Sequence, residues 1–320
     1  MMNKLLPALL LMLATVAGAQ PPKRPLIPLD APPLTDYLPV SGAEAFQMDG
    51  HEFASVASVA FTAAGHLLVL HRGEQPFLEF DANGKLLRSF GDPSLFGRSH
   101  GLTIDAAGNL WVTDVGTQVV MKMNPDGEVL MTLGNKGEAG EWNEASGSHL
   151  FNQPNEVALD AEGNIYVAQG HGPAEPRILK FTPEGRFIKQ WGSRGTGPGQ
   201  FAVAHSIQID AAGNVYVADR ENFRVQIFDT EGNYLREWKF NAMACAIHLH
   251  DDGYMYMTTG FDGQFARLSM DGQVLGAIGS PGADNGQFGE AHFLTLDEND
   301  NVFVADVVNR RVQKYLKQSD

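Results

Sequence analysis

Six copies of one sequence pattern make up most of this 320-residue chain, and they constrain its fold more than any other feature. Each copy contains an apolar run, a turn rich in small and polar residues, and a second apolar run. The first copy starts at Ala57, and the others start with the segments HGLTIDAAGNLWVTD, NEVALDAEGNIYVAQ, HSIQIDAAGNVYVAD, CAIHLHDDGYMYMTT and HFLTLDENDNVFVAD. The starts at positions 57, 100, 155, 205, 245 and 292 are 40 to 55 residues apart, close to the period of propeller repeats. The chain is therefore expected to form a circular array of similar units.

Each unit is predicted to be a small antiparallel sheet. In the second copy, apolar and polar residues alternate in Leu102–Ile104, a Gly-Asn turn follows, and the apolar run Leu110–Val112 comes after it, as expected for paired strands. Two further strands, Val119–Met123 and Val129–Leu133, are joined by a Pro-Asp-Gly turn. Four antiparallel strands make one blade, and a ring of blades hides most strand edges. We predict an all-β, six-bladed β-propeller over residues 43–320.

The ring is expected to close through an N-terminal strand. The last copy has room for only three strands, whereas Ala45–Gly50 resembles the fourth strand of the other copies, such as Val129–Gly134. We predict that Ala45–Gly50 completes the last blade.

A phenylalanine column lies four residues before most copy starts. A bulky aromatic side chain at one fixed phase is interpreted as packing between blades rather than as a binding feature. The column holds Phe53, Phe96, Phe151, Phe201 and Phe288, with Asn241 in the fifth copy.

The N-terminal region is predicted to direct export. Lys4, the apolar run Leu5–Val16 and the small residues Ala17–Ala19 have the layout of a signal peptide. Residues 1–19 are therefore expected to be removed, leaving a periplasmic or secreted protein. Residues 20–42 are rich in proline and are interpreted as an extended lead-in.

Composition limits the partners. The formal net charge of −15 argues against nucleic acid or an anionic membrane surface as a partner, and no later segment is apolar for long enough to cross a membrane. Cys245 is the only cysteine, so no intramolecular disulfide can form and stability must come from packing and ring closure. We expect a monomer.

Three histidines share one position of the repeat. His100, His205 and His292 are the first residues of the second, fourth and sixth copies. In a closed ring they would lie at one mouth of the central channel with threefold spacing, and three imidazoles with one open position are typical of a catalytic zinc site. An alternative is that the position simply tolerates polar groups beside a wet channel, since Asn155 and Cys245 occupy it in the third and fifth copies.

Two arginines share a second position, directly after the second strand. Arg72 and Arg220 occupy it in the first and fourth copies, which lie opposite each other in a ring of six. A guanidinium binds a carboxylate through two parallel hydrogen bonds, so we expect a small-molecule or peptide substrate with a terminal carboxylate. The alternative is a salt bridge between blades, with Asp114, Asp219 or Asp306 as the acidic partner.

Several long segments resemble peptidyl-α-hydroxyglycine α-amidating lyases, a family of zinc-dependent NHL-repeat propellers. The similarity extends from about Val56 to the C-terminus and is carried by LHRG from Leu70, HGLTIDAAGNLWVTDV from His100, FNQPNEVAL from Phe151, FIKQWG from Phe187, GQFAVAHSI from Gly199, VADRENFRVQIF from Val217 and the final AHFLTLDENDNVFVAD. The resemblance implies that the three repeat histidines bind zinc and that Arg72 and Arg220 act in the active site. It also implies cleavage of a C-terminal α-hydroxyglycine into a peptide amide and glyoxylate.

Two positions depart from the family pattern. The family has a catalytic tyrosine just after the second strand of the third blade, whereas this chain has His171. A histidine there can serve as a catalytic base near neutral pH, and a metal-bound hydroxide is the alternative base. The family's structural calcium is held by carbonyls that correspond to Val59 and Leu102 and by a carboxylate at the position of Phe293. Phe293 cannot supply that ligand, so calcium is not expected here.

Two other classes of function stay open on the sequence alone. NHL-type propellers also serve as non-catalytic binding modules, and the replaced tyrosine is compatible with lost catalysis. Other propeller enzymes are hydrolases or lyases with different small substrates, such as lactones or esters. Those enzymes often use calcium held by acidic and amide side chains, of which the channel offers few beyond Asn155 and Glu156.

Overall fold

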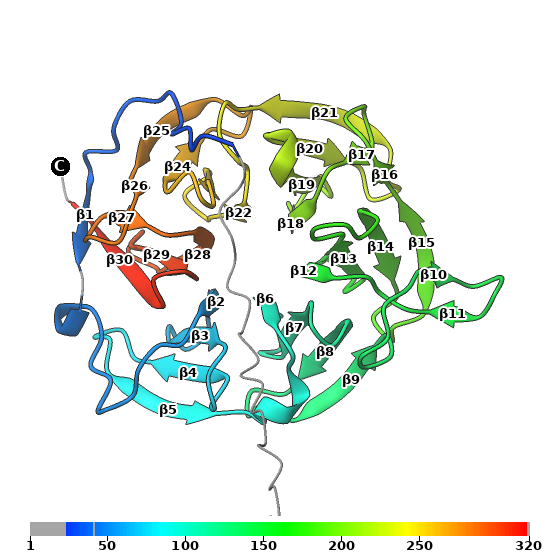
Figure 1. The fold of residues 1–320 in the computed structure, drawn as a ribbon, viewed down its shortest axis with the longest axis horizontal. Coiled ribbons are helices and arrows are strands. Elements are labelled where there is room, and N and C mark those ends of the chain that lie inside the picture. Colours follow the sequence, from blue (N-terminus) through cyan, green and yellow to red (C-terminus); the bar gives the residue numbers. More distant parts are fainter. Residues whose placement is uncertain (1–23, 41, 319–320) are drawn as a thin grey trace, which may run out of the picture.

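The computed structural model describes residues 24–40 and 42–318. Six four-stranded antiparallel sheets stand around a central channel, and Figure 1 shows them as a closed ring of blades. The prediction of an all-β, six-bladed propeller is therefore confirmed. The predicted signal peptide, residues 1–19, lies outside the described residues.

The blades follow one another along the chain, each starting with its innermost strand. Blades one to three contain β2 (Val56–Phe61), β3 (Leu67–His71), β4 (Phe77–Phe80) and β5 (Leu86–Phe90); β6 (Ser99–Ile104), β7 (Leu110–Asp114), β8 (Val119–Met123) and β9 (Val129–Leu133); and β12 (Pro154–Leu159), β13 (Ile165–Gln169), β14 (Arg177–Phe181) and β15 (Phe187–Trp191). Blades four to six contain β18 (Ala204–Ile209), β19 (Val215–Asp219), β20 (Arg224–Phe228) and β21 (Tyr234–Lys239); β22 (Ala246–Leu249), β23 (Met255–Thr258), β24 (Phe265–Leu268) and β25 (Val274–Ile278); and β28 (Ala291–Leu296), β29 (Val302–Asp306), β30 (Arg311–Lys317) and β1 (Tyr37–Val40). Neighbouring innermost strands contact each other all the way round the ring.

Short ribbons and two of the 3-10 turns lie between the blades, whereas the third turn, η3 (Arg220–Asn222), lies inside blade four between β19 and β20. The ribbon strands are β10 (Trp142–Asn143), β11 (Ser148–His149), β16 (Ser193–Arg194), β17 (Gln200–Phe201), β26 (Ser280–Pro281) and β27 (Gln287–Phe288), and the other two 3-10 turns are η1 (Gly42–Glu44) and η2 (Pro93–Leu95). Within the described residues, no helix has the length and apolar character needed to cross a membrane.

A turn centred on aspartate joins the two innermost strands of blades two, three and four. In blade two, the Asp105 carboxylate accepts hydrogen bonds from the backbone N–H groups of Ala107 (3.0 Å) and Asn109 (2.8 Å). Gly108 has a φ of +83°, a left-handed conformation that glycine adopts at little cost. Equivalent turns are built on Asp160 and Asp210. The turn fixes the pairing of the innermost strand and so the position of its first residue.

Aromatic side chains fill the spaces between blades, as the phenylalanine column predicted. Phe151, Phe201 and Phe288 are fully buried, each in an apolar cluster with residues from two neighbouring blades. Phe53 and Phe96 pack at the edges of the corresponding clusters. Burying one such side chain stabilises the fold by about 1.5 to 3 kcal/mol, so these contacts hold the blades together without disulfides.

The strand that closes the ring is not the predicted one. β1 pairs antiparallel with β30 as the outermost strand of the sixth blade, with Tyr37 opposite Lys317. Figure 1 shows this blue strand beside the red C-terminal strand. The prediction for Ala45–Gly50 was wrong, because that segment follows η1 and makes an isolated bridge to blade one. Pro39 suggests a loop when the segment is considered alone, but an edge strand tolerates proline because one side of it needs no N–H donor.

Residues 24–34 lie along the fifth blade, ahead of β1. The Leu29 N–H group donates to Oε1 of Gln264 (2.6 Å), and the Asn241 side chain donates to the carbonyl of Pro28 (2.9 Å). Leu29 is buried in the cluster between blades four and five. Leu29 thus supplies an apolar side chain between blades four and five, where the phenylalanine column has Asn241 in place of a phenylalanine.

Candidate metal centre

The histidines at the second residue of three inner strands meet at one mouth of the channel. His100 in β6, His205 in β18 and His292 in β28 have ring centroids 4.7 to 5.0 Å apart. Each strand has a shift in pairing register at or beside its histidine, and a bulge of this kind redirects a side chain. The structure therefore brings together the three histidines that share the first repeat position.

Each of these histidines is oriented by the blade that follows it. Nδ1 lies close to the carbonyl oxygen of the first residue of the next copy, at 2.9 Å for His100 and Asn155, 2.8 Å for His205 and Cys245, and 2.7 Å for His292 and Ala57. A carbonyl oxygen can only accept, so Nδ1 carries the proton and Nε2 keeps its lone pair. Metal-binding histidines are commonly fixed by such a hydrogen bond.

The centre favours neutral imidazoles with free nitrogen atoms. Burial lowers the pKa of His292 to about 3 and holds the pKa values of His100 and His205 well below the usual range. Nε2 of His100 and Nε2 of His205 are buried without a hydrogen-bond partner among the described residues. A buried polar atom without a partner costs about 1 to 3 kcal/mol, and a metal ion would satisfy both. Neutral imidazoles are preferred zinc ligands, so these residues fit a zinc ion.

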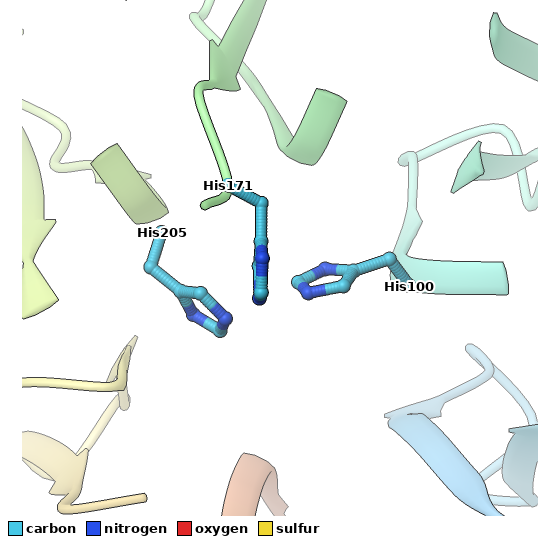
Figure 2. Close-up of side chains that lie close together, drawn as sticks. All are labelled: His100, His171 and His205. Carbon is cyan, nitrogen blue, oxygen red and sulfur yellow. The ribbon is translucent and has the colours of Figure 1, made fainter. Parts of the chain in front are cut away.

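His171 joins this group from the third blade. It follows β13, and one nitrogen each from His100, His171 and His205 lie within 4.8 Å of one another. Figure 2 shows the three rings converging, with His171 between the other two. The His171 centroid is 5.5 Å from that of His100 and 5.7 Å from that of His205. Burial and the charges of nearby arginines hold the pKa of His171 well below its usual range, so this imidazole is also neutral.

Arg220 lies at this mouth and is neutralised by acidic neighbours. It is buried, donates to Glu221 (2.8 Å) and lies 3.8 Å from Glu290. Burial opposes its charge, but Glu221 and other neighbours outweigh this effect and raise the pKa of Arg220. The acidic partners considered from the sequence bind other groups, as seen for Asp114, Asp219 and Asp306.

Arg72 and Arg98 form a second cationic group, and within the described residues neither makes an ion pair. Nε of Arg72 donates to the carbonyl of Ser99 (3.1 Å), the residue after Arg98. Nε of Arg98 is buried without a hydrogen-bond partner in the described part of the chain. Burial and the charge of Arg98 lower the pKa of Arg72 to about 10, so Arg72 is still cationic at neutral pH. Two guanidinium groups without a counter-ion suit a carboxylate or another small anion.

Arg98 and Glu290 were not predicted as site residues, although they share a third repeat position two residues before the start of a copy. The backbone carbonyl at this position accepts from the residue that follows the second strand. The distance is 3.1 Å from Val115 to Arg98 and 3.3 Å from Val307 to Glu290. The same bond joins Arg72 to Ser55 and Arg220 to Val203. This position therefore lies beside the arginine position, and comparing the two positions would have revealed both residues.

The residues do not fit the calcium ion of the resembling family. The Phe293 ring packs against the rings of the three repeat histidines. Val59 and Leu102 line a channel cavity of about 320 Å³ together with Phe293, and among its described lining residues Glu156 is the only acid. Burial raises the pKa of Glu156 to about 8. Because calcium prefers ionised carboxylates, the side chains around this cavity do not provide a calcium site.

Comparison with known proteins agrees with the fold and with part of the family resemblance. Residues 144–275 match a family model described as a 6-bladed beta-propeller. Peptidyl-glycine alpha-amidating monooxygenase A of Xenopus laevis is 32% identical over 304 residues, which cover 81% of this chain and 31% of that protein. A probable peptidyl-alpha-hydroxyglycine alpha-amidating lyase of Caenorhabditis elegans is 34% identical over 204 residues, or 55% of this chain and 56% of that protein.

The similarity is partial in length. This chain spans about half or less of the length of the first curated relatives that it matches. The protein is an NHL-repeat, six-bladed propeller. Its propeller also resembles the solved structure of a gluconolactonase from Xanthomonas campestris, with a TM-score of 0.61, 15% identity and coverage of 92% of this chain and 98% of that one. At this identity the propeller shares a fold with the gluconolactonase and nothing more is implied.

Proposed function

We propose that this propeller is a zinc-dependent lyase that cleaves the C–N bond of a peptidyl-α-hydroxyglycine or a similar carbinolamide. The products would be an amide and glyoxylate. One observation carries the proposal: neutral, carbonyl-oriented imidazoles with free nitrogens lie at the same mouth as two arginines that lack an acidic partner in the described residues. Sequence similarity to amidating enzymes supports the choice of reaction.

The repeat histidines would hold the metal. In His100, His205 and His292 the Nδ1 hydrogen bond to a carbonyl leaves Nε2 as the ring nitrogen that would bind the ion. When bound there, zinc supplies a Lewis acid that polarises an oxygen of the substrate. The buried strands and the Phe293 ring below the histidines hold the imidazoles in place and limit access of water from the channel.

The arginines would orient the substrate. Arg72 and Arg98 provide two guanidinium groups for the carboxylate of the α-hydroxyglycine, and their backbones are fixed by hydrogen bonds at the ends of inner strands. Arg220 is already paired with Glu221 and Glu290, so it does not offer a free anion site. Fixing the carboxylate places the scissile bond beside the histidines, which lowers the entropic part of the barrier.

The reaction needs a proton transfer and no added water. Removing the proton from the substrate hydroxyl allows a C=O bond to form as the C–N bond breaks, and the leaving amide nitrogen takes up a proton. His171 is the neutral base that stands beside the repeat histidines. It could accept the hydroxyl proton and return it to the leaving nitrogen, as general acid–base catalysis requires.

Incubation of the zinc-loaded protein with a peptide ending in α-hydroxyglycine tests the reaction. We expect equal amounts of peptide amide and glyoxylate, with no release in the presence of His100→Ala protein. Intact substrate after incubation with metal-loaded wild-type protein would overturn the proposed reaction. Parallel incubation with a lactone distinguishes a hydrolase from a lyase, and inactivity on both substrates would favour a binding propeller.

The location and state of the protein form part of the proposal. The signal-like segment Leu5–Val16 and the absence of a second cysteine suit an exported monomer. Cell fractionation, combined with light scattering of the purified protein, tests both points. A cytoplasmic pool of uncleaved protein would contradict export.

A further inference from the structure

We propose that His171 is the fourth protein ligand of the metal centre in its resting state. The inference rests on the proposed metal site but not on the proposed reaction. It assigns a structural role to the residue that replaces the family tyrosine. It also makes the resting centre a four-imidazole site rather than a three-imidazole site with an open position.

The distances between the rings support four ligands. Four imidazoles around one zinc ion at about 2.0 to 2.1 Å would have ring centroids roughly 5 Å apart. The centroids of the repeat histidines are 4.7 to 5.0 Å apart, and His171 lies 5.5 and 5.7 Å from two of them. The nitrogens of His171, His100 and His205 already lie within 4.8 Å of one another. Small side-chain rotations would therefore bring the four imidazoles to the spacing of four ligands around one ion.

The loop after β13 aims His171 into the channel. Gly170 has a φ of +112°, and a Cβ atom there would lie 2.3 Å from Cα of Pro176, so only glycine allows this turn. Arg194 holds the far side of the loop through the carbonyls of Gly172 and Ala174. The His171 side chain is directed towards His100 and His205, as Figure 2 shows.

Both ring nitrogens of His171 are available. Within the described residues its side chain makes no hydrogen bond, whereas each repeat histidine donates to a carbonyl. Cys245, the other candidate for a fourth ligand, is buried with its Sγ 3.8 Å from Nδ1 of His205, the side of that ring turned away from the metal. His171 therefore fits the fourth position better than the thiol does.

The missing hydrogen bond also predicts how firmly His171 binds. A histidine ligand that lacks a second hydrogen bond is less well oriented and less basic than one that has it. His171 should thus be the weakest of the four ligands. In the proposed reaction it would have to leave the metal before it could act as a base, so the resting centre is closed and opens only with substrate.

Cobalt substitution and X-ray absorption test the assignment. We would load wild-type, His171→Phe and His149→Phe proteins with Co²⁺, record the visible spectra and measure affinity by competition with a chelator. His149 is exposed and stacks on Trp142, so its variant controls for the substitution itself. We expect His171→Phe to bind cobalt at least tenfold more weakly with an altered spectrum, and His149→Phe to match the wild type. X-ray absorption of the zinc-loaded wild type should give four imidazole ligands.

Each outcome separates ligation from activity. Three imidazoles in the wild type, or the same affinity and spectrum in His171→Phe, would overturn the assignment. The absence of cobalt binding by the wild type would overturn it as well. A four-imidazole centre without glyoxylate release would leave the assignment standing and remove the proposed reaction. The wild-type absorption measurement decides the question even if the variant folds poorly.

Discussion

Blades two, four and six repeat one device, whereas blade three departs from it at three places. In the even-numbered blades the second residue of the inner strand is a histidine whose Nδ1 bonds to the next blade. Blade three has Asn155 at that position, Glu156 after it and His171 in the loop beyond β13. The carbonyl oxygen of Asn155 accepts from Nδ1 of His100 in blade two.

The difference shows that residues repeated around the ring and a residue found in one blade only have different roles in the site. A threefold frame arises when one substitution is repeated at equivalent positions, because the ring imposes the geometry. A group that must act differently from the frame, such as a displaceable ligand or a base, cannot be held in the same way. His171 lies on a loop without the carbonyl partner of the other histidines, and this is what makes it suited to a second role.

The largest expected effect comes from removing a histidine of the even blades. His205→Ala should lower zinc affinity by about 10³-fold or more and abolish turnover, since it removes a buried ligand with a fixed orientation. Metal analysis after dialysis measures the loss. His149→Ala, at an exposed position, should keep one equivalent. If His205→Ala also kept a full equivalent of zinc, the three repeat histidines would not form the metal site.

Glu156 of blade three gives the next largest effect, and the effect concerns stability. Burial raises its pKa to about 8 in the folded protein, while the unfolded value is near 4.5. The folded state therefore holds the proton more tightly, and the stability associated with it is lost as the pH rises from about 4.5 to about 8. Glu156→Gln, which mimics the protonated form, should gain about 3 kcal/mol over the wild type at pH 7 and little at pH 4.5.

Urea unfolding of metal-free protein at several pH values checks this prediction. Glu162→Gln, in an exposed turn of the same blade, should behave as the wild type at every pH. A constant difference between Glu156→Gln and the wild type from pH 4.5 to pH 9 would show that Glu156 does not titrate in this way.

The fold and the positions of the three repeat histidines follow from the sequence repeat, whereas the position of His171 in blade three does not. A repeat in sequence becomes a repeat in space, so aligning the six copies is enough to bring His100, His205 and His292 to one position. The carbonyl partners of Nδ1 are backbone atoms of other blades, and no side-chain pattern announces them. His171 stands out in the sequence only as a departure from a family pattern, because a loop of glycines has no periodicity that reveals where its side chains point.

Other misses have local physical causes. Arg98 lies outside the repeat positions that hold the histidines and Arg72, although its carbonyl is bonded to the arginine position in space. Pro39 conceals β1, since proline is a poor strand former except at an edge, and whether a strand is an edge depends on the assembled ring. The carboxylate of Glu156 is identified as a buried, protonated group only when the surrounding blades are in place.

Substitution of Arg98 tests whether blade two binds the substrate carboxylate in addition to providing a metal ligand. Losing one charged hydrogen bond to a carboxylate costs about 1.5 to 2 kcal/mol, so Arg98→Gln should raise KM about 10- to 30-fold and change kcat less. Arg98→Lys should recover part of the lost affinity. Arg186→Gln, at an exposed position in blade three, should leave KM unchanged. Steady-state kinetics with the α-hydroxyglycine peptide gives both constants. A fall in kcat at constant KM would mean that Arg98 acts in the chemical step and not in substrate binding.

The smallest expected effect is the response of the wild-type protein to calcium. Phe293 of blade six packs on three imidazoles where a carboxylate would be needed, and Glu156 from the opposite blade is protonated at neutral pH. Calcium or a calcium chelator at millimolar concentration should therefore shift Tm by less than about 1 °C. In Phe293→Asp the lost packing should lower Tm, and calcium should restore part of it by neutralising a buried carboxylate. A calcium response in the wild type equal to that of Phe293→Asp would mean that backbone carbonyls bind the ion without an acidic side chain.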